Sequence, residues 1–288
     1  MTDATKLSPA LIDRVVAALG FAQAPAPDFA GLRALYHAWC RGVPFDNLRK
    51  RIHLARGLTT AFPGDGAEDF FEAWLRYRTG GTCWAGNGAL CTLLQALGFP
   101  ARRGVATMLA RPNIPPNHGT VLVEYDTGLF VVDASMLHSE PLRLDEQAET
   151  VIEHPAWGVR AGKRDGHWYI RWRPLNLPGG LECRIDRIVA TAEEFSERHE
   201  MTRPWGGFNF EIHARRISGD SMLGTCLAKR VEFDARGAVV ERGLDREAQR
   251  RFLIDELGIS EAIVAQLPAD TPTPPPPGSR TAQAAAKR

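Results

Sequence analysis

The first third of the chain carries apolar residues at the alternating three-and-four spacing that places them on one face of a helix. Ser8 and Pro9 are suited to an N-cap and a first helical position, and apolar residues then follow at this spacing up to Leu19. The same spacing, ended by glycine or proline, predicts three more helices, over residues 32–39, 67–78 and 83–97. The N-terminal part is therefore expected to be mostly helical.

After Pro100 the pattern changes to short apolar runs separated by turn residues, which is typical of β-strands. Two runs on either side of Asp126-Thr127-Gly128 predict a hairpin with strands over residues 121–123 and 129–132. Further strands are predicted over residues 168–172, 183–189, 209–217, 227–233 and 239–240, and a last helix over 245–257. Residues 269–288 are rich in proline, threonine and alanine, which predicts a disordered tail.

The composition excludes several classes of protein. The 288 residues are 44% apolar and 24% charged, which is ordinary for a soluble globular protein. A net charge of +1 argues against nucleic-acid binding as the main activity. No apolar run approaches the roughly 18 residues of a membrane helix, and the N-terminus lacks the layout of a secretory signal. The five cysteines show no regular spacing, so we expect a cytoplasmic protein with reduced thiols.

A candidate nucleophile, Cys83, stands at the start of one predicted helix, and His118 and Asp133 follow it along the chain. A free thiol is mostly protonated near neutral pH, but a helix N-terminus and a neighbouring imidazole both favour the thiolate. An aspartate on the far ring nitrogen then fixes the imidazole. These residues predict acyl transfer through a thioester on Cys83. The structural alternative is a buried helical cysteine, a loop histidine and an aspartate that ends a strand.

Metal binding finds little support, because the chain has no CxxC pair and no HxxxH spacing. The other seven histidines show no partner at a meaningful spacing, so most of them are expected at the surface.

Two segments resemble the arylamine N-acetyltransferase family. Residues 43–48 read V-P-F-D-N-L and look like the family's V-P-F-E-N-L, and residues 80–83 read G-G-T-C and look like its R-G-G-x-C. The matches in order and approximate spacing continue with Asn87, Leu97-Gly98-Phe99, His118 and Val132-Asp133. The first motif separates this family from the transglutaminase-like group, which shares only the order of cysteine, histidine and aspartate.

The resemblance implies an α+β fold with a core like that of cysteine proteases and transglutaminases. An N-terminal helical bundle (1–98) carries the nucleophile, a central β-barrel (99–192) carries the histidine and aspartate, and a C-terminal α/β lid (193–268) follows. Cys83 is then expected to take an acetyl group from acetyl-CoA and pass it to an arylamine, hydrazine or hydroxylamine in a ping-pong reaction without a metal. Phe45, Met136 and Phe208 become candidates for substrate binding, although core packing explains Phe45 equally well.

The chain departs from the family pattern near the nucleophile. Thr79 and Ala85 stand where the family has an arginine and a glutamate, which removes a basic and an acidic group together. After the aspartate, Ala134-Ser135-Met136-Leu137 replaces V-G-F-G, and Leu137 is expected to add bulk to the cleft. These changes leave acyl transfer in place but leave the acceptor open.

Three alternatives therefore stay open beside an acyl-CoA-dependent transferase with a small-molecule amine as acceptor. The first is an amide synthase that takes a larger acyl chain from an acyl carrier protein. The second is a transglutaminase-like cysteine hydrolase, which leaves residues 43–48 unexplained. The third is a protein that has lost its activity and is kept for binding, which the presence of all three reactive residue types disfavours.

Overall fold

The computed structural model describes residues 7–111, 113–277 and 279. Its N-terminal part contains the helices α1 (Pro9–Ala18), α2 (Phe29–Gly42), α3 (Leu48–Ala55), α4 (Ala67–Tyr77) and α5 (Cys83–Ala96). Side-chain caps begin two of them, because Ser8 Oγ accepts a hydrogen bond from Leu11 N and Asp28 Oδ1 accepts one from Gly31 N. The four predicted helices are present, and α3 is an addition.

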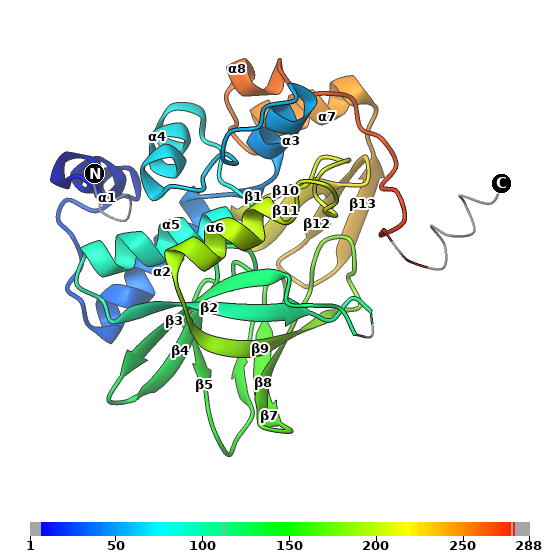
Figure 1. The fold of residues 1–288 in the computed structure, drawn as a ribbon. Helices are drawn as coiled ribbons and strands as arrows, with labels where there is room; N and C mark the ends of the chain where they lie inside the picture. Colours follow the sequence, from blue (N-terminus) through cyan, green and yellow to red (C-terminus); the bar gives the residue numbers. More distant parts are fainter. Residues whose placement is uncertain (1–6, 112, 278, 280–288) are drawn as a thin grey trace.

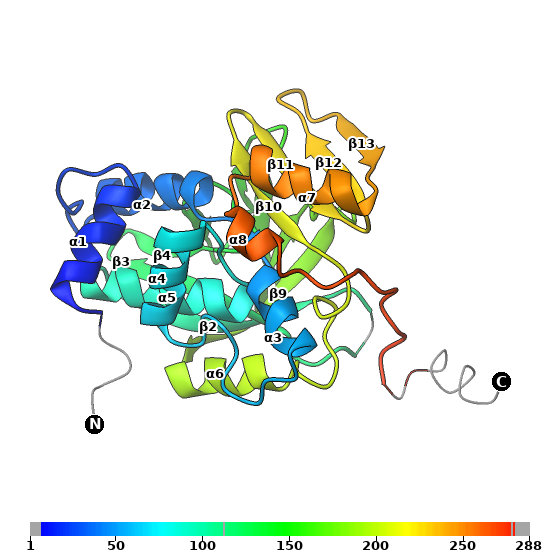
Figure 2. The same ribbon diagram turned by 90° about the horizontal axis from the view of Figure 1, so that it is seen from above.

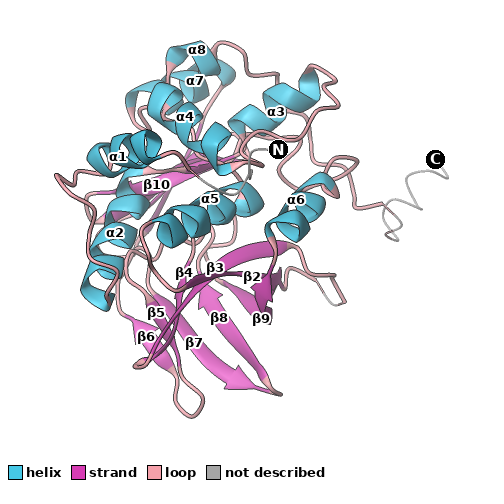
Figure 3. Cartoon of the chain, turned by 60° about the vertical axis from the view of Figure 1, so that its left-hand side comes forward, coloured by secondary structure: helices cyan, strands magenta, loops and turns pink. Residues whose placement is uncertain are grey.

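The central helix α5 is buried on almost every side. It packs against α4, against strands β2 and β3 of the large sheet, and against α6 (Ala192–Glu200). Small residues allow close contact here, since a Cβ atom on Gly88 would lie 3.7 Å from the Phe195 ring on α6. The helix therefore lies at the centre of the molecule, between the other helices and the barrel (Figure 3).

The large sheet is antiparallel and curls into a barrel below the helices (Figure 1). Its order is β5-β4-β3-β2-β9-β8-β7-β6, and β5 contacts both β6 and β7, so the sheet is nearly closed. The strands are β2 (Ala101–Met108), β3 (His118–Tyr125), β4 (Gly128–Val132), β5 (Leu142–Leu144), β6 (Thr150–Ile152), β7 (Val159–Arg164), β8 (His167–Trp172) and β9 (Leu181–Ala190). Apolar side chains such as Leu122, Val131 and Ile170 fill the interior.

A second antiparallel sheet has the order β1-β10-β11-β12-β13, which joins an N-terminal strand to C-terminal ones. Its strands are β1 (Phe45–Asp46), β10 (Ala214–Ser218), β11 (Ser221–Cys226), β12 (Lys229–Phe233) and β13 (Val239–Gly243). The helices α7 (Arg246–Asp255) and α8 (Glu261–Val264) lie beside α3 over this sheet (Figure 2). An apolar cluster that includes Leu48, Leu223 and Leu253 joins these elements.

The α+β fold class with a central barrel is thus confirmed, whereas several boundaries differ from the prediction. The strand expected over residues 209–217 begins only at Ala214. The strand expected from Leu227 begins at Lys229, because Leu227 and Ala228 form a two-residue turn with φ of 52° and 53°. Such turns normally contain Asn-Gly, and this apolar pair gave no turn signal in the sequence.

The segment expected to be a disordered tail is described only in part. Within it, Asp270 Oδ1 accepts a hydrogen bond from Arg51 Nη1 at 2.6 Å, and Pro274 O accepts one from Trp205 Nε1 at 3.1 Å. Residues 280–288 lie outside the described residues, so this part of the expectation stays a prediction, as do the domain boundaries. Among the helices described, none is long and apolar enough to cross a membrane.

Candidate active site

A cavity of about 480 Å³ lies between the barrel, the second sheet and the start of α5. Cys83 and His118 both line it, whereas Asp133 is fully buried behind His118. The rest of the wall is largely apolar and includes Phe45, Trp172 and Phe208. The three residues singled out in the sequence are therefore brought to one place.

The loop before Cys83 is fixed by the segment 43–48. Gly80 N donates a hydrogen bond to Asp46 Oδ2 at 2.5 Å, and Asp46 N donates one to Gly81 O at 3.2 Å. A Cβ atom on Gly80 would lie 1.7 Å from Pro44 O, so only glycine fits this close approach. The two motifs that resemble the family are thus one structural unit, which starts α5 at Cys83.

The position of Cys83 as the first residue of α5 places its sulfur beside the unpaired N–H groups of the helix end. The Cys83 side chain is 7% exposed, and its Sγ lies 3.9 Å from Asn117 O. The His118 side chain lines the same cavity, and Cys83 is one of the groups that raise the pKa of this histidine. The thiol therefore faces the cavity, with a partial positive charge on one side and an imidazole on the other.

The imidazole and the carboxylate form a buried pair, in which His118 Nε2 lies 2.8 Å from Asp133 Oδ2. Since Nε2 is taken by the carboxylate, Nδ1 is the ring nitrogen that remains for a proton transfer with Cys83. Burial of His118 opposes its charge, but Asp133 and then Cys83 outweigh burial and raise the pKa of His118 above its usual range. Burial acts on Asp133 in the opposite sense, yet His118 and nearby N–H groups hold its pKa well below the ordinary value.

Asn87 joins the helix to the strands that carry the pair. It lies one turn after Cys83 on α5, and its Nδ2 donates to Gly119 O at 2.6 Å. Its Oδ1 accepts a hydrogen bond from Ala134 N at 2.9 Å. The neighbours of both His118 and Asp133 are therefore tied to the helix that carries the thiol, which fixes the distances within the site.

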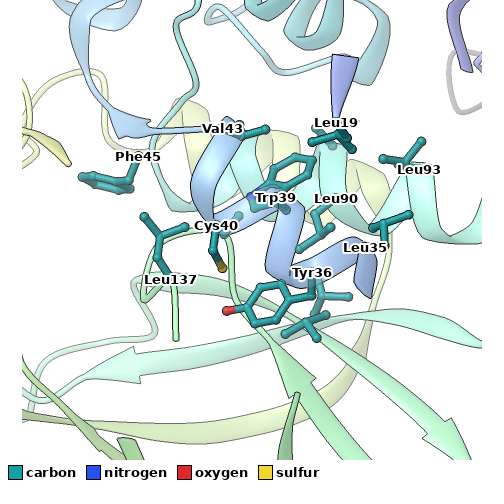
Figure 4. Close-up of a cluster of buried hydrophobic side chains, with 14 of the residues drawn as sticks. Leu19, Leu35, Tyr36, Trp39, Cys40, Val43, Phe45, Leu90, Leu93 and Leu137 are labelled. Carbon is teal, nitrogen blue, oxygen red and sulfur yellow. The ribbon is translucent and has the colours of Figure 1, made fainter. Parts of the chain in front are cut away.

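Tyr36 on α2 holds the backbone of Asp133. The sequence analysis placed this residue only on the apolar face of a helix. Its hydroxyl donates to Asp133 O at 2.9 Å and accepts from Asp133 N at 3.0 Å and from His138 N at 3.2 Å. A tyrosine hydroxyl has one hydrogen to donate and two lone pairs, so all its capacity is used. Figure 4 shows this hydroxyl at the edge of the apolar cluster. The sequence could have indicated this role, because a tyrosine on a buried helix face still needs hydrogen-bond partners for its hydroxyl.

Replacing Tyr36 with phenylalanine is expected to lower the free energy of unfolding by about 1–3 kcal/mol, because two buried N–H groups lose their acceptor. It is also expected to lower kcat by loosening Asp133. Urea denaturation and steady-state kinetics measure the two effects. Tyr125→Phe is the matched control, since the buried hydroxyl of Tyr125 has no hydrogen-bond partner among the described residues. Equal effects of the two variants would contradict this role for Tyr36.

The candidate substrate-binding residues fall in two different places. Phe45 and Phe208 line the cavity with ring centroids 5.2 Å apart. Met136 is 3% exposed, packs inside the barrel and is not among the lining residues described. Leu137 is fully buried in the helical core near Cys40 (Figure 4), so the bulk expected from it lies in the core rather than in the cleft.

The two departures from the family pattern beside the nucleophile are accommodated by packing. The Cβ of Ala85 lies 2.9 Å from the position of a Cβ on Gly81 and 3.0 Å from that of one on Gly64. Ala85 is therefore packed closely against both glycines, and a side chain on either glycine would meet it. Thr79 is fully buried, and its hydroxyl has no hydrogen-bond partner among the described residues. Neither position therefore places a charge beside Cys83.

The expectation that the other histidines lie mostly at the surface is wrong for several of them. His53, His138 and His199 are 5%, 0% and 2% exposed. Burial lowers the pKa of His138 to about 4 and that of His199 to about 3. His138 Nδ1 donates to Glu140 O at 2.7 Å, and His199 Nε2 lies 3.5 Å from Thr82 Oγ1 at the start of α5.

This burial predicts loss of stability in mild acid. His138 and His199 stay neutral when folded but gain protons in the unfolded chain below about pH 6.5. Their contribution is complete above that pH and is lost as the pH falls toward their folded pKa values. We expect the free energy of unfolding to fall by about 2 kcal/mol per histidine between about pH 7 and pH 5. His118, whose pKa is raised, opposes this only partly.

Urea denaturation at the two pH values measures the effect, and His199→Gln is expected to remove about half of it. A free energy of unfolding that stays constant over this interval would show that these histidines are not neutral in the folded protein.

Among the described residues, no group of three or more histidine, cysteine, aspartate or glutamate side chains is arranged to hold a metal ion. A thiol, an imidazole and a carboxylate brought together are the residue types that a cysteine nucleophile with a base and an orienting acid requires. Such a site, on this barrel-and-helix fold, defines an acyl-transferring class of enzyme.

Comparison with known proteins supports this class. A family model described as N-acetyltransferase matches residues 28–173, about half of the chain. The chain therefore belongs to the N-acetyltransferase family, as a divergent member, and is an acyltransferase. The match includes Cys83, His118 and Asp133 within its span, and it confirms the family resemblance seen in the sequence. No curated protein matches the chain.

Solved structures similar to this chain are arylamine N-acetyltransferases. The enzyme of Mycobacterium marinum in complex with CoA is 19% identical, with a TM-score of 0.75 over 89% of this chain and 96% of that one. The enzyme of Nocardia farcinica is 18% identical, with a TM-score of 0.75 over 92% and 94%. That of Salmonella typhimurium is 19% identical, with a TM-score of 0.73 over 91% and 98%. At these identities the likeness concerns the fold.

Proposed function

We propose that this chain transfers an acetyl group from acetyl-CoA to a small-molecule amine through an acetyl thioester on Cys83. The observation that carries the proposal is the buried His118–Asp133 pair at 2.8 Å, beside a thiol at the start of α5. The CoA bound to the similar M. marinum enzyme supports the choice of donor.

The first half of the reaction uses a thiolate–imidazolium pair. The Cys83 sulfur attacks the carbonyl carbon of acetyl-CoA and forms a new C–S bond. The bond to the CoA sulfur breaks, and that sulfur leaves with the proton of His118 as free CoA. Backbone N–H groups in the first turn of α5 point toward the negative oxygen of the tetrahedral intermediate and stabilise it.

The second half returns the site to its starting state. The nitrogen of the amine attacks the thioester carbon, and the now neutral His118 accepts the proton that this nitrogen loses. The C–S bond to Cys83 breaks, so the acetylated amine leaves and the thiolate–imidazolium pair is restored. Asp133 stays ionised throughout and holds the ring in the required orientation.

The charges on the cavity wall support an anionic donor. The lining residues include Lys50, Arg111 and Arg198, whereas none of those described is an aspartate or glutamate. A cleft lined by one sign of charge attracts ligands of the opposite sign, and CoA carries several phosphate charges. A carrier-protein donor has no observation in its favour, and the membership of the N-acetyltransferase family disfavours a hydrolase.

The test is intact mass spectrometry of the protein after incubation with acetyl-CoA, followed by peptide mapping. We expect one acetyl group, on Cys83, with release of an equal amount of free CoA. Cys91 and Cys226 serve as internal controls, because burial raises the pKa of both thiols to about 11. Cys226 also lines the cavity, so it shows whether proximity alone leads to acetylation. An unchanged mass without CoA release would refute the donor, and acetylation of the control cysteines alone would refute the role of Cys83.

A further inference from the structure

Arg215 is a buried cation on the wall of the cavity. It lies on β10 directly opposite Phe45 on β1, and Phe45 in turn pairs with Gly81 in the loop before the nucleophile. The residue is 6% exposed. Its guanidinium carbon lies 5.2 Å from the ring centroid of Phe45 and 4.5 Å from that of Trp172. The side chain is therefore held between two aromatic residues that line the same cavity.

The guanidinium of Arg215 lacks a counter-ion. No carboxylate among the described residues forms an ion pair with it, and its Nε is buried without a hydrogen-bond partner. Its Nη2 donates to Ser135 O, in the loop that follows Asp133. Burial lowers the pKa of Arg215 to about 10, although Asp133 acts in the opposite direction. A buried charge without a partner is costly, so this arrangement calls for an anion from outside the chain.

We propose that Arg215 binds the carboxylate of an amine acceptor, so that the enzyme acetylates amines that also carry a carboxylate group. The planar guanidinium matches a carboxylate, and the flanking rings of Phe45 and Trp172 suit a flat or apolar spacer between carboxylate and amine. This assignment rests on the proposed function, because it concerns the second substrate of the same site.

The phosphates of CoA are the other source of negative charge, and the position of Arg215 favours the acceptor. Arg215 donates to Ser135 O, two residues from Asp133, and it stands opposite Phe45, which pairs with Gly81 just before Cys83. The phosphates of CoA are separated from its thioester by the whole pantetheine arm. The more exposed Arg111 and Arg198 also line the cavity and are better placed for phosphates.

The experiment compares 4-aminobenzoate with its uncharged amide, 4-aminobenzamide, as acceptors at a fixed concentration of acetyl-CoA. For the unmodified protein we expect kcat/KM to favour the carboxylate by about 10- to 100-fold, the range for a hydrogen bond to a charged group. Arg215→Gln is expected to bring the ratio to within about twofold of one, and Arg215→Lys to retain part of the preference. Comparing the ratio between variants cancels the intrinsic reactivities of the two amines.

Arg216→Gln is the matched control. Arg216 is the next residue on β10, does not line the cavity, and donates to Glu256 O at 2.9 Å. This variant is expected to keep the ratio of the unmodified protein. If Arg215→Gln does not fold, the test uses the other two proteins. The proposal then requires that the unmodified protein prefers 4-aminobenzoate over 4-aminobenzamide and that Arg215→Lys shows a smaller preference.

A second measurement separates the two sources of negative charge. Acetylation of Cys83 is followed with acetyl-CoA and with 4-nitrophenyl acetate, which has no phosphate. A slower reaction of Arg215→Gln with acetyl-CoA alone would assign Arg215 to phosphate binding and overturn the proposal. A normal acetyl-enzyme in the unmodified protein, without preference for 4-aminobenzoate, would also overturn it while leaving the proposed function intact. Absence of any acetyl-enzyme would instead refute the proposed function.

Discussion

Replacing Cys83 with alanine is expected to abolish acetyl transfer, with a decrease in kcat of at least about 10⁴-fold. Both halves of the proposed reaction pass through a thioester bond to this sulfur, and no other described thiol lies against an imidazole–carboxylate pair. The release of CoA and the acetylation of an arylamine measure the two halves of the reaction. Both are expected to stop.

Cys91→Ala is the control for this variant. Cys91 lies on the same helix and is fully buried in the apolar core, so its loss affects stability rather than chemistry. We expect its kcat to stay within about threefold of that of the unmodified protein. Turnover that survives in Cys83→Ala would mean that acetyl-CoA reacts directly with the amine, without an acetyl-enzyme.

Replacing Asp133 with asparagine is expected to lower kcat by about 10³- to 10⁴-fold with little change in KM. The neutral amide no longer stabilises the imidazolium and favours the wrong ring tautomer. The variant is also expected to make Cys83 slower to react with iodoacetamide near neutral pH, because the thiolate loses its charged partner. Steady-state kinetics and the rate of alkylation measure these effects.

Asp145→Asn is a close structural control for Asp133→Asn. Asp145 Oδ1 accepts hydrogen bonds from Gln147 N and Ala148 N, just as Asp133 Oδ1 accepts them from Ser135 N and Met136 N. Asp145 forms an ion pair with Arg143 rather than with a histidine, and it lies in an exposed turn. Unchanged activity in this variant would assign the loss in Asp133→Asn to the histidine contact rather than to the turn.

The sequence predicted the reactive residues because their chemistry depends on residue type and local position. Cys83 at a helix start and His118 and Asp133 near strands were readable from the pattern, and the structure brings them together. Their mutual distances were not readable, because these depend on Asn87 and Tyr36, which act from α5 and α2 across long sequence separations.

Helix α3 was missed because tertiary contacts replace the local signal. Helix α3 has the basic sequence L-R-K-R-I-H-L-A and lacks a clear apolar stripe. Lys50 and Arg51 are nevertheless buried. Arg51 pairs with Asp270, and Lys50 donates to Thr202. Arg215 was overlooked for the same reason, because the sequence shows a basic pair and cannot show which of the two side chains faces a cavity.

The short strand β1 has a consequence for how substrates reach the sulfur. On one side β1 pairs with β10 of the second sheet, and on the other it is bonded to the loop at Gly80 and Gly81. That sheet therefore cannot swing outward as a hinged cover without breaking the hydrogen bonds that start α5. We therefore expect substrates to reach the sulfur without an outward swing of this sheet, because such a motion would displace the sulfur at the same time.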